Sequence, residues 1–256
     1  MTATTNDPRA AEYRAAGGFA SSISTTIARH PEWWTIGLCL VAWSALIAGN
    51  MGSSGGGVFC GSLHRATALD GPVWTAGLGE WSLMVAAMML PLVIAPVRRA
   101  ARASLWRRRH RAIAEFLVGY GLIWTLFGGA ALVILALYQP TPPWAPVAVF
   151  AIAALWELSP AKRRALSLCH RTIPLRPTGW RADFDCLRYG ALQGRSCCSS
   201  CWVMMLGSTL TPQPLLAMAG IAGLCAVQRY RPRRRQYFEA LALGAGALAC
   251  AIAALA

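Results

Sequence analysis

A short segment in the second half of the chain concentrates sulfur-bearing side chains. Cys197, Cys201 and Met205 are spaced four residues apart, so in a helix all three lie on one face. Cys198 lies beside them, one turn from Cys201. Thiolates and thioethers are soft ligands that suit Cu(I), zinc or iron–sulfur chemistry. Aliphatic side chains would fill an apolar helix with less reactivity, so this segment predicts a metal or redox site, with Cu(I) as the first candidate and zinc as the second.

A second sulfur group lies in an apolar segment nearer the N-terminus. Met84 and Met88 share a helical face, and Glu80 extends that face by one turn. Pro91 removes a backbone hydrogen bond and predicts a kink there. At 1.5 Å rise per residue, Met84 and Arg195 each lie about 15 Å along their segments. We therefore expect the two segments to touch and to enclose one pocket that holds the cysteines, the methionines, Glu80 and Arg195.

Arg195 is an unusual residue for such a position. A charged side chain at the centre of a membrane costs at least about 2.5 to 3.5 kcal/mol and is usually paired. Glu80 is the partner that the spacing indicates. The alternative is that Arg195 extends along the helix toward the cytoplasmic side, beside Arg188.

Other sulfur and histidine positions have several interpretations. Four isolated residues are interpreted as core packing: Cys39, Cys225, Cys250 and Met218. Cys60 lies on the predicted outer, oxidising side and could pair with Cys201 in a disulfide. Cys169 and His170 lie in a predicted cytoplasmic segment and could receive or hand over a metal, although two adjacent residues are a weak signal.

The composition indicates a membrane protein. Of the 256 residues, 56% are hydrophobic and 13% are charged, whereas a soluble domain carries about 25% charged residues. A span needs about 20 apolar residues. The fold class that we expect is all-α: a polytopic membrane helix bundle in residues 33–256, preceded by a flexible cytoplasmic tail, residues 1–32. The predicted spans are 33–50, 74–97, 113–138, 143–158, 185–209, 214–228 and 237–256.

The distribution of basic residues sets the expected orientation. The net charge is +14, and Lys and Arg gather in residues 98–111, 162–181 and 229–235, whereas the alternate connections contain only Arg65. Cytoplasmic loops of membrane proteins carry this excess. The pattern predicts a cytoplasmic N-terminus in a bacterial-type inner membrane, with the lipid bilayer rather than nucleic acid as the partner of the positive charge. The first thirty residues carry no recognisable signal peptide.

Three motifs together carry a family resemblance. They are the run MVAAMMLP at residues 84–91, the turn LSPAK at residues 158–162, and the glycine- and cysteine-rich helix at residues 190–205. In combination they resemble domain-of-unknown-function family 2182, which comprises predicted metal-binding integral membrane proteins. The resemblance covers residues 74–235 and implies a metal site within the membrane.

The cysteine motif departs from that family's pattern. The family is expected to show Cys-x-Gly-Cys-Cys-Trp, where this chain reads Cys197-Cys198-Ser199-Ser200-Cys201-Trp202. Ser200 stands where a cysteine is expected, and Cys198 is additional. The resemblance therefore leaves the number of metal ligands open.

The leading hypothesis is metal handling, as transport, delivery or sensing, with a metal donor or acceptor protein as partner. The candidate ligands are Cys197, Cys198, Cys201, Met84, Met88 and Met205, with Glu80 and Arg195 as supporting polar residues. The alternatives are a membrane thiol–disulfide redox subunit and a structural subunit of a membrane complex. The chain has no phosphate-binding glycine loop, Gly-x-Ser-x-Gly elbow or His-Glu-x-x-His motif, so the sequence favours a protein without enzymatic activity.

Overall fold

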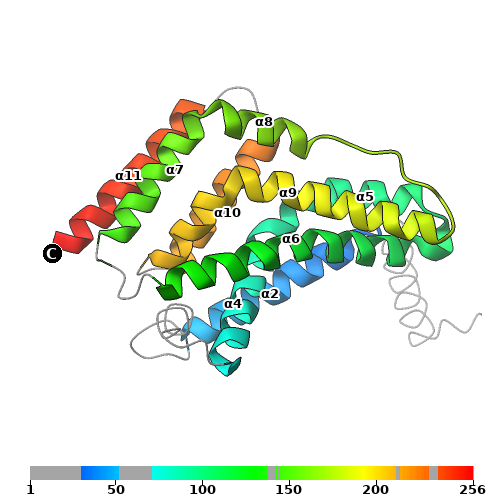
Figure 1. Ribbon diagram of the computed structural model, residues 1–256, viewed down its shortest axis with the longest axis horizontal. Helices are drawn as coiled ribbons and strands as arrows, with labels where there is room; N and C mark the ends of the chain where they lie inside the picture. Colours follow the sequence, from blue (N-terminus) through cyan, green and yellow to red (C-terminus); the bar gives the residue numbers. More distant parts are fainter. Residues whose placement is uncertain are drawn as a thin grey trace, which may run out of the picture.

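The computed structural model describes residues 30–51, 71–137, 142, 144–211, 214–230 and 236–255, and within these residues every regular element is helical (Figure 1). The elements are α2 (Trp33–Met51), α4 (Gly71–Met89), η1 (Leu90–Val93), α5 (Ile94–Ala103), η2 (Trp106–Arg108), α6 (Arg109–Leu137), α7 (Ala145–Leu158), α8 (Pro160–Cys169), α9 (Trp180–Leu210), α10 (Pro214–Tyr230) and α11 (Gln236–Leu255). The expected all-α class is confirmed. Residues 1–29 of the predicted tail and Cys60 lie outside the described residues.

Several helices are long and apolar enough to cross a membrane. Among the described residues these are Trp33–Met51, Trp74–Ala103 and Trp106–Leu137, and a fourth arises if α7 and α8, which are bent by 73° at Ser159, form one broken span. Large aliphatic side chains on these helices face outward, with Leu126 63% and Leu155 69% exposed. Such surfaces are normal where lipid replaces water as the solvent. The fold is therefore consistent with a membrane protein.

Glycines let α6 and α9 pack along one another, as Figure 1 shows for the green and yellow helices. A Cβ placed on Gly190 would lie 2.0 Å from the backbone oxygen of Phe116, and one on Gly119 would lie 2.1 Å from the oxygen of Leu187. Gly194 continues the same contact one turn later. Small residues at this spacing allow two backbones to approach closely in membrane helices. This contact fixes how α6 presents its side chains to the cysteines of α9.

Pro91 breaks the second long helix, as the sequence predicts. The α-helix ends at Met89, and Pro91 lies in the 3-10 turn η1 before α5 begins. Proline has no backbone N–H, so the carbonyl of Ala87, four residues earlier, loses its helical partner. That carbonyl instead accepts hydrogen bonds from Trp43 Nε1 at 3.0 Å and from Cys39 Sγ at 3.3 Å. The break therefore docks α2 against α4 and ends α4 at Met89.

The end of the predicted tail is part of the packed structure. Glu32 is buried, and its carboxylate forms an ion pair with Arg98 of α5 at 2.5 Å. Burial alone would raise the pKa of Glu32, but its backbone hydrogen bond, His30 and Arg98 together hold the pKa below the ordinary value. The start of α2 is thereby tied to the basic end of α5.

Candidate metal centre

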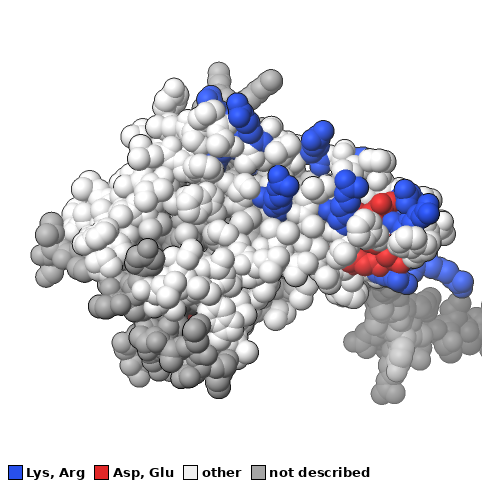
Figure 2. Space-filling view, in the orientation of Figure 1, with Lys and Arg blue, Asp and Glu red and all other residues white. Residues whose placement is uncertain are grey.

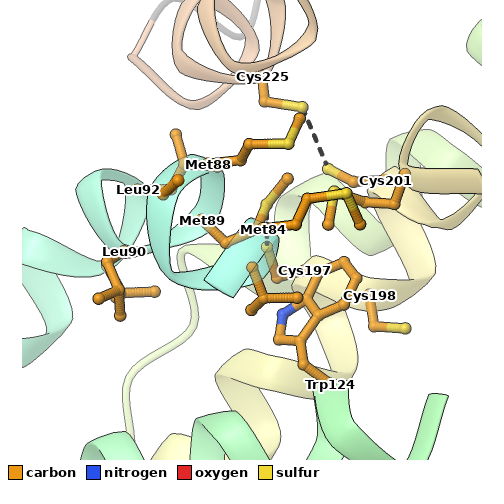
Figure 3. Close-up of a cluster of buried hydrophobic side chains, with 14 of the residues drawn as sticks. Met84, Met88, Met89, Leu90, Leu92, Trp124, Cys197, Cys198, Cys201 and Cys225 are labelled. Atoms are coloured by element: carbon orange, nitrogen blue, oxygen red, sulfur yellow. Dashed lines mark hydrogen bonds between the residues drawn. The ribbon is translucent and has the colours of Figure 1, made fainter. Parts of the chain in front are cut away.

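Four sulfur atoms form a connected group between α4, α9 and α10 (Figure 3). The Cys197 Sγ lies 3.8 Å from the Met89 Sδ, and the Cys201 Sγ lies 3.6 Å from the Cys225 Sγ. Cys197 and Cys201 lie one turn apart on the same buried face of α9, which joins the two pairs. All four residues are at least 95% buried. We call Met89, Cys197, Cys201 and Cys225 the sulfur chain.

The spacing of the sulfur chain suits a soft metal. A metal–thiolate bond is about 2.3 Å long, so two sulfurs at neighbouring corners of a tetrahedron lie ~3.8 Å apart. The Cys197–Met89 and Cys201–Cys225 distances, 3.8 and 3.6 Å, match this edge. Both pairs therefore have a separation at which two sulfurs can bind one soft ion with little movement of the helices.

The described residues contain no group of three or more His, Cys, Asp or Glu side chains that could hold a metal ion. In the sulfur chain the contacts are pairwise, with Cys197 against Met89 and Cys201 against Cys225. A thioether is one available third ligand. Met88 points toward Cys201 and Cys225 in Figure 3 and is the methionine placed to supply it.

The structure brings the two predicted segments together through their side chains. Besides the Cys197–Met89 contact, the single hydroxyl hydrogen of Ser208 on α9 is within reach of two acceptors, the Met205 carbonyl at 2.8 Å and the Met84 Sδ at 3.4 Å. Met84 and Met205 are both buried. They lie beside the sulfur chain, and the residue that contacts Cys197 is Met89.

Three predicted site residues lie apart from the sulfur chain. Cys198 points away from Cys201 (Figure 3) and lines a separate cavity of about 340 Å³, together with the exposed residue Arg195. The ion pairs of the described residues do not include one between Arg195 and Glu80. Glu80 is half-buried on α4.

The sequence pattern does not indicate a ligand role for three residues of this site. Met89 was not singled out, and Cys225 was interpreted as packing. Tyr120 of α6 donates a hydrogen bond to the Cys197 Sγ at 3.2 Å and is fully buried. A signal for Cys225 exists in α10, where Met218, Cys225 and Gln228 lie on one buried face. A cysteine and a glutamine on a buried stripe are a reason to expect a polar partner.

A buried ion pair lies next to the cysteines. Lys162 pairs with Glu157, and Gln228 Nε2 donates to the same Glu157 oxygen at 3.0 Å. Ser159 caps α8 by accepting a hydrogen bond from the Lys162 backbone N–H, which places the ammonium group beside the bend between α7 and α8. Because the two charges of the pair cancel, Lys162 and Glu157 together place a neutral polar group beside Cys225 rather than a free positive charge.

Cys169 and His170 follow at the end of α8. Burial raises the pKa of the Cys169 thiol to about 11, and Arg229 and Ser200 partly oppose this effect. Burial and the nearby Arg229 lower the pKa of His170. At neutral pH both side chains are therefore uncharged and able to approach a cation without repelling it.

Comparison with curated proteins and with solved structures gives no match. The model of one protein family, PpoB2, described as copper chaperone, does match, and it covers residues 78–253. That range contains the sulfur chain, Tyr120 and the Lys162–Glu157 pair. Because the match extends over more than half of the chain, this protein belongs to the PpoB2 family of copper chaperones.

Proposed function

We propose that this protein is an integral membrane copper chaperone that holds Cu(I) as cargo on the sulfur chain and exchanges it with a partner protein. The observation that carries the proposal is the group of buried sulfurs, Met89, Cys197, Cys201 and Cys225, with two sulfur–sulfur distances that fit a shared soft ion. The family's copper role makes Cu(I) the first candidate and zinc the second.

In this proposal Cys201 and Cys225 form the main binding pair, and Cys197 and Met89 form a second pair beside it. Cys201 and Cys225 supply two thiolates from different helices. Cys197 and Met89 form the neighbouring pair, so a copper ion could move between them by exchanging one sulfur at a time. Met84, Met88 and Met205 surround this group as buried thioethers. Cys198, Arg195 and Glu80 take no direct part in this arrangement.

The proposal includes seven spans and a cytoplasmic N-terminus. The spans would be α2, the broken α4–α5 unit, α6, α7, α9, α10 and α11, with α8 along the inner surface. Lys and Arg gather along one edge of the molecule (Figure 2), over α8 and the adjoining ends of α5 and α9. This grouping supports placing that edge in the cytoplasm of a bacterial-type inner membrane. Reporter fusions at the α6–α7 and α8–α9 connections should then report opposite sides.

Copper content tests the proposal directly. The protein is purified in detergent, loaded with Cu(I) under anaerobic reducing conditions, and measured by mass spectrometry. We expect about one copper per chain in the wild type and in Cys250→Ser, a matched control on α11, and little copper in Cys201→Ser/Cys225→Ser. Wild-type protein without copper, or a double variant that keeps it, would refute the proposal.

One observation favours a second candidate function. The Cys201 and Cys225 sulfurs, 3.6 Å apart on α9 and α10, are close enough to form a disulfide after a small side-chain movement. A thiol–disulfide subunit would lose two free thiols on oxidation and regain them on reduction, without stoichiometric metal. Counting free thiols in the same samples separates the two functions.

A further inference from the structure

A small cavity lies between the cysteines of the sulfur chain and the end of α8. Its volume is about 10 Å³, close to the minimum that holds one water molecule or a small ion. Cys197, Cys201 and Cys225 line one part of it, and Cys169 of α8 lines another. The remaining lining residues are Leu92, Val93, Leu166, Gln193, Ser200, Gln228 and Arg229.

Two glutamines present unpartnered oxygens in this lining. Gln193 Nε2 donates to the Arg171 carbonyl at 2.9 Å, and Gln228 Nε2 donates to the Glu157 carboxylate at 3.0 Å. These bonds fix the amide orientation, because a flip would place oxygen against oxygen. Both Oε1 atoms are buried and have no hydrogen-bond partner among the described residues. Buried acceptors without a donor indicate a place for a cation or for a group that carries a proton.

Cys169 stands at the basic side of this cavity. It ends α8, is 3% exposed, and interacts with Ser200 and Arg229. Arg171, which follows α8, anchors Gln193. In the orientation proposed above, this is the cytoplasmic side, so Cys169 on that side and the Cys201–Cys225 pair line the same cavity.

We propose that this cavity is the passage by which Cu(I) moves between the cytoplasmic side and the sulfur chain, with Cys169 as a transient ligand and Gln193 and Gln228 as oxygen contacts. The proposal rests on the copper function proposed above. A bond between copper and a cytoplasmic thiolate donor breaks as a bond to the Cys169 sulfur forms. The Cys169 proton passes to the departing donor thiolate, and copper stays Cu(I). Cys201 then replaces Cys169 in the same way.

The rate of copper release distinguishes a residue that lies on the passage from a ligand that only stores copper. Protein in lipid nanodiscs is loaded with Cu(I), mixed with bathocuproine disulfonate, and followed by stopped-flow absorbance. We expect Cys169→Ser to keep the wild-type copper content and to release copper at least tenfold more slowly. Gln193→Leu should also slow release, which keeps the test valid if Cys169→Ser folds poorly. Cys250→Ser should match the wild type.

Several outcomes would overturn the passage. If both Cys169→Ser and Gln193→Leu released copper at the wild-type rate, neither residue would take part in copper movement. If Cys169→Ser lost all of its copper, Cys169 would be a storage ligand rather than a residue of the passage. Wild-type protein without copper would refute the copper function itself, which is a different result.

The side of exchange gives an independent check. Bathocuproine disulfonate does not cross membranes, so it should remove copper from inside-out vesicles of an expression host and leave it in spheroplasts. Removal from spheroplasts alone would contradict the passage.

Discussion

The close contact of α6 and α9 makes Gly190 a sensitive position. A Cβ on Gly190 would lie 2.0 Å from the Phe116 oxygen, with the Phe116 carbonyl carbon and Cα also within 3.0 Å. All three atoms belong to the backbone, so no side chain can turn away. Because real Cβ atoms essentially never approach closer than 3.0 Å, Gly190→Ala must move α6 and α9 apart by about 1 Å.

This movement has a cost that can be worked out from the structure. The Tyr120–Cys197 hydrogen bond, 3.2 Å long, would stretch to about 4.2 Å and be lost, which removes about 0.5 to 1.5 kcal/mol. Overpacking of a tight interface costs about 1 to 3 kcal/mol more. We therefore expect Gly190→Ala to lower the free energy of unfolding by about 1.5 to 4.5 kcal/mol.

The matched control is Gly121→Ala on α6. A Cβ there meets nothing within 4 Å, so this variant should be neutral or stabilised by up to about 1 kcal/mol, as for alanine in an exposed helix. Thermal unfolding of both variants in the same detergent measures the difference. Equal stability of the two variants would refute the view that backbone contact, rather than helix propensity, governs position 190.

Three further predictions concern single side chains near the sulfur chain. Tyr120→Phe should lower the free energy of unfolding by about 0.5 to 1.5 kcal/mol, measured by thermal unfolding, because the Cys197 thiol loses its donor. Lys162→Met should cost about 3 to 5 kcal/mol because Glu157 stays buried without a counter-charge. Adding Glu157→Gln should restore most of that loss, and no restoration would count against the ion pair. Since burial raises the pKa of Cys169 to about 11, its iodoacetamide labelling, followed by peptide mass spectrometry, should rise about tenfold per pH unit from pH 7 toward 11; a plateau near pH 9 would contradict this.

Most of the longer helices were predictable because each contains an apolar run. The predicted segment 214–228 corresponds to α10, which spans Pro214–Tyr230. The predicted segment 185–209 corresponds to the longer helix α9, Trp180–Leu210. The difference in α9 lies at its N-terminus, where polar residues such as Arg181 continue the helix beyond the apolar region. Helix α8 was not expected, because its polar sequence carries no span signal and depends on the Ser159 cap.

The candidate metal centre could be predicted from the sequence only in part. Helical periodicity placed Cys197 and Cys201 on one face, but it could not identify their partners on other helices. Met89, the last residue of α4 before the break at Pro91, contacts Cys197 of a different helix. Cys225 lies opposite Cys201 only because α10 packs against α9. Both contacts are tertiary, and a periodic pattern within one helix does not contain them.

The residues of the sulfur chain lie far apart in the sequence, so they are synthesised at different times. Met89 belongs to α4, Cys197 and Cys201 belong to α9, and Cys225 belongs to α10. A nascent chain that ends before α10 has the cysteines of α9 but lacks their thiol partner. The complete set of sulfurs therefore exists only after α10 has been synthesised, so in the function proposed above copper loading follows assembly of the helices rather than accompanying translation.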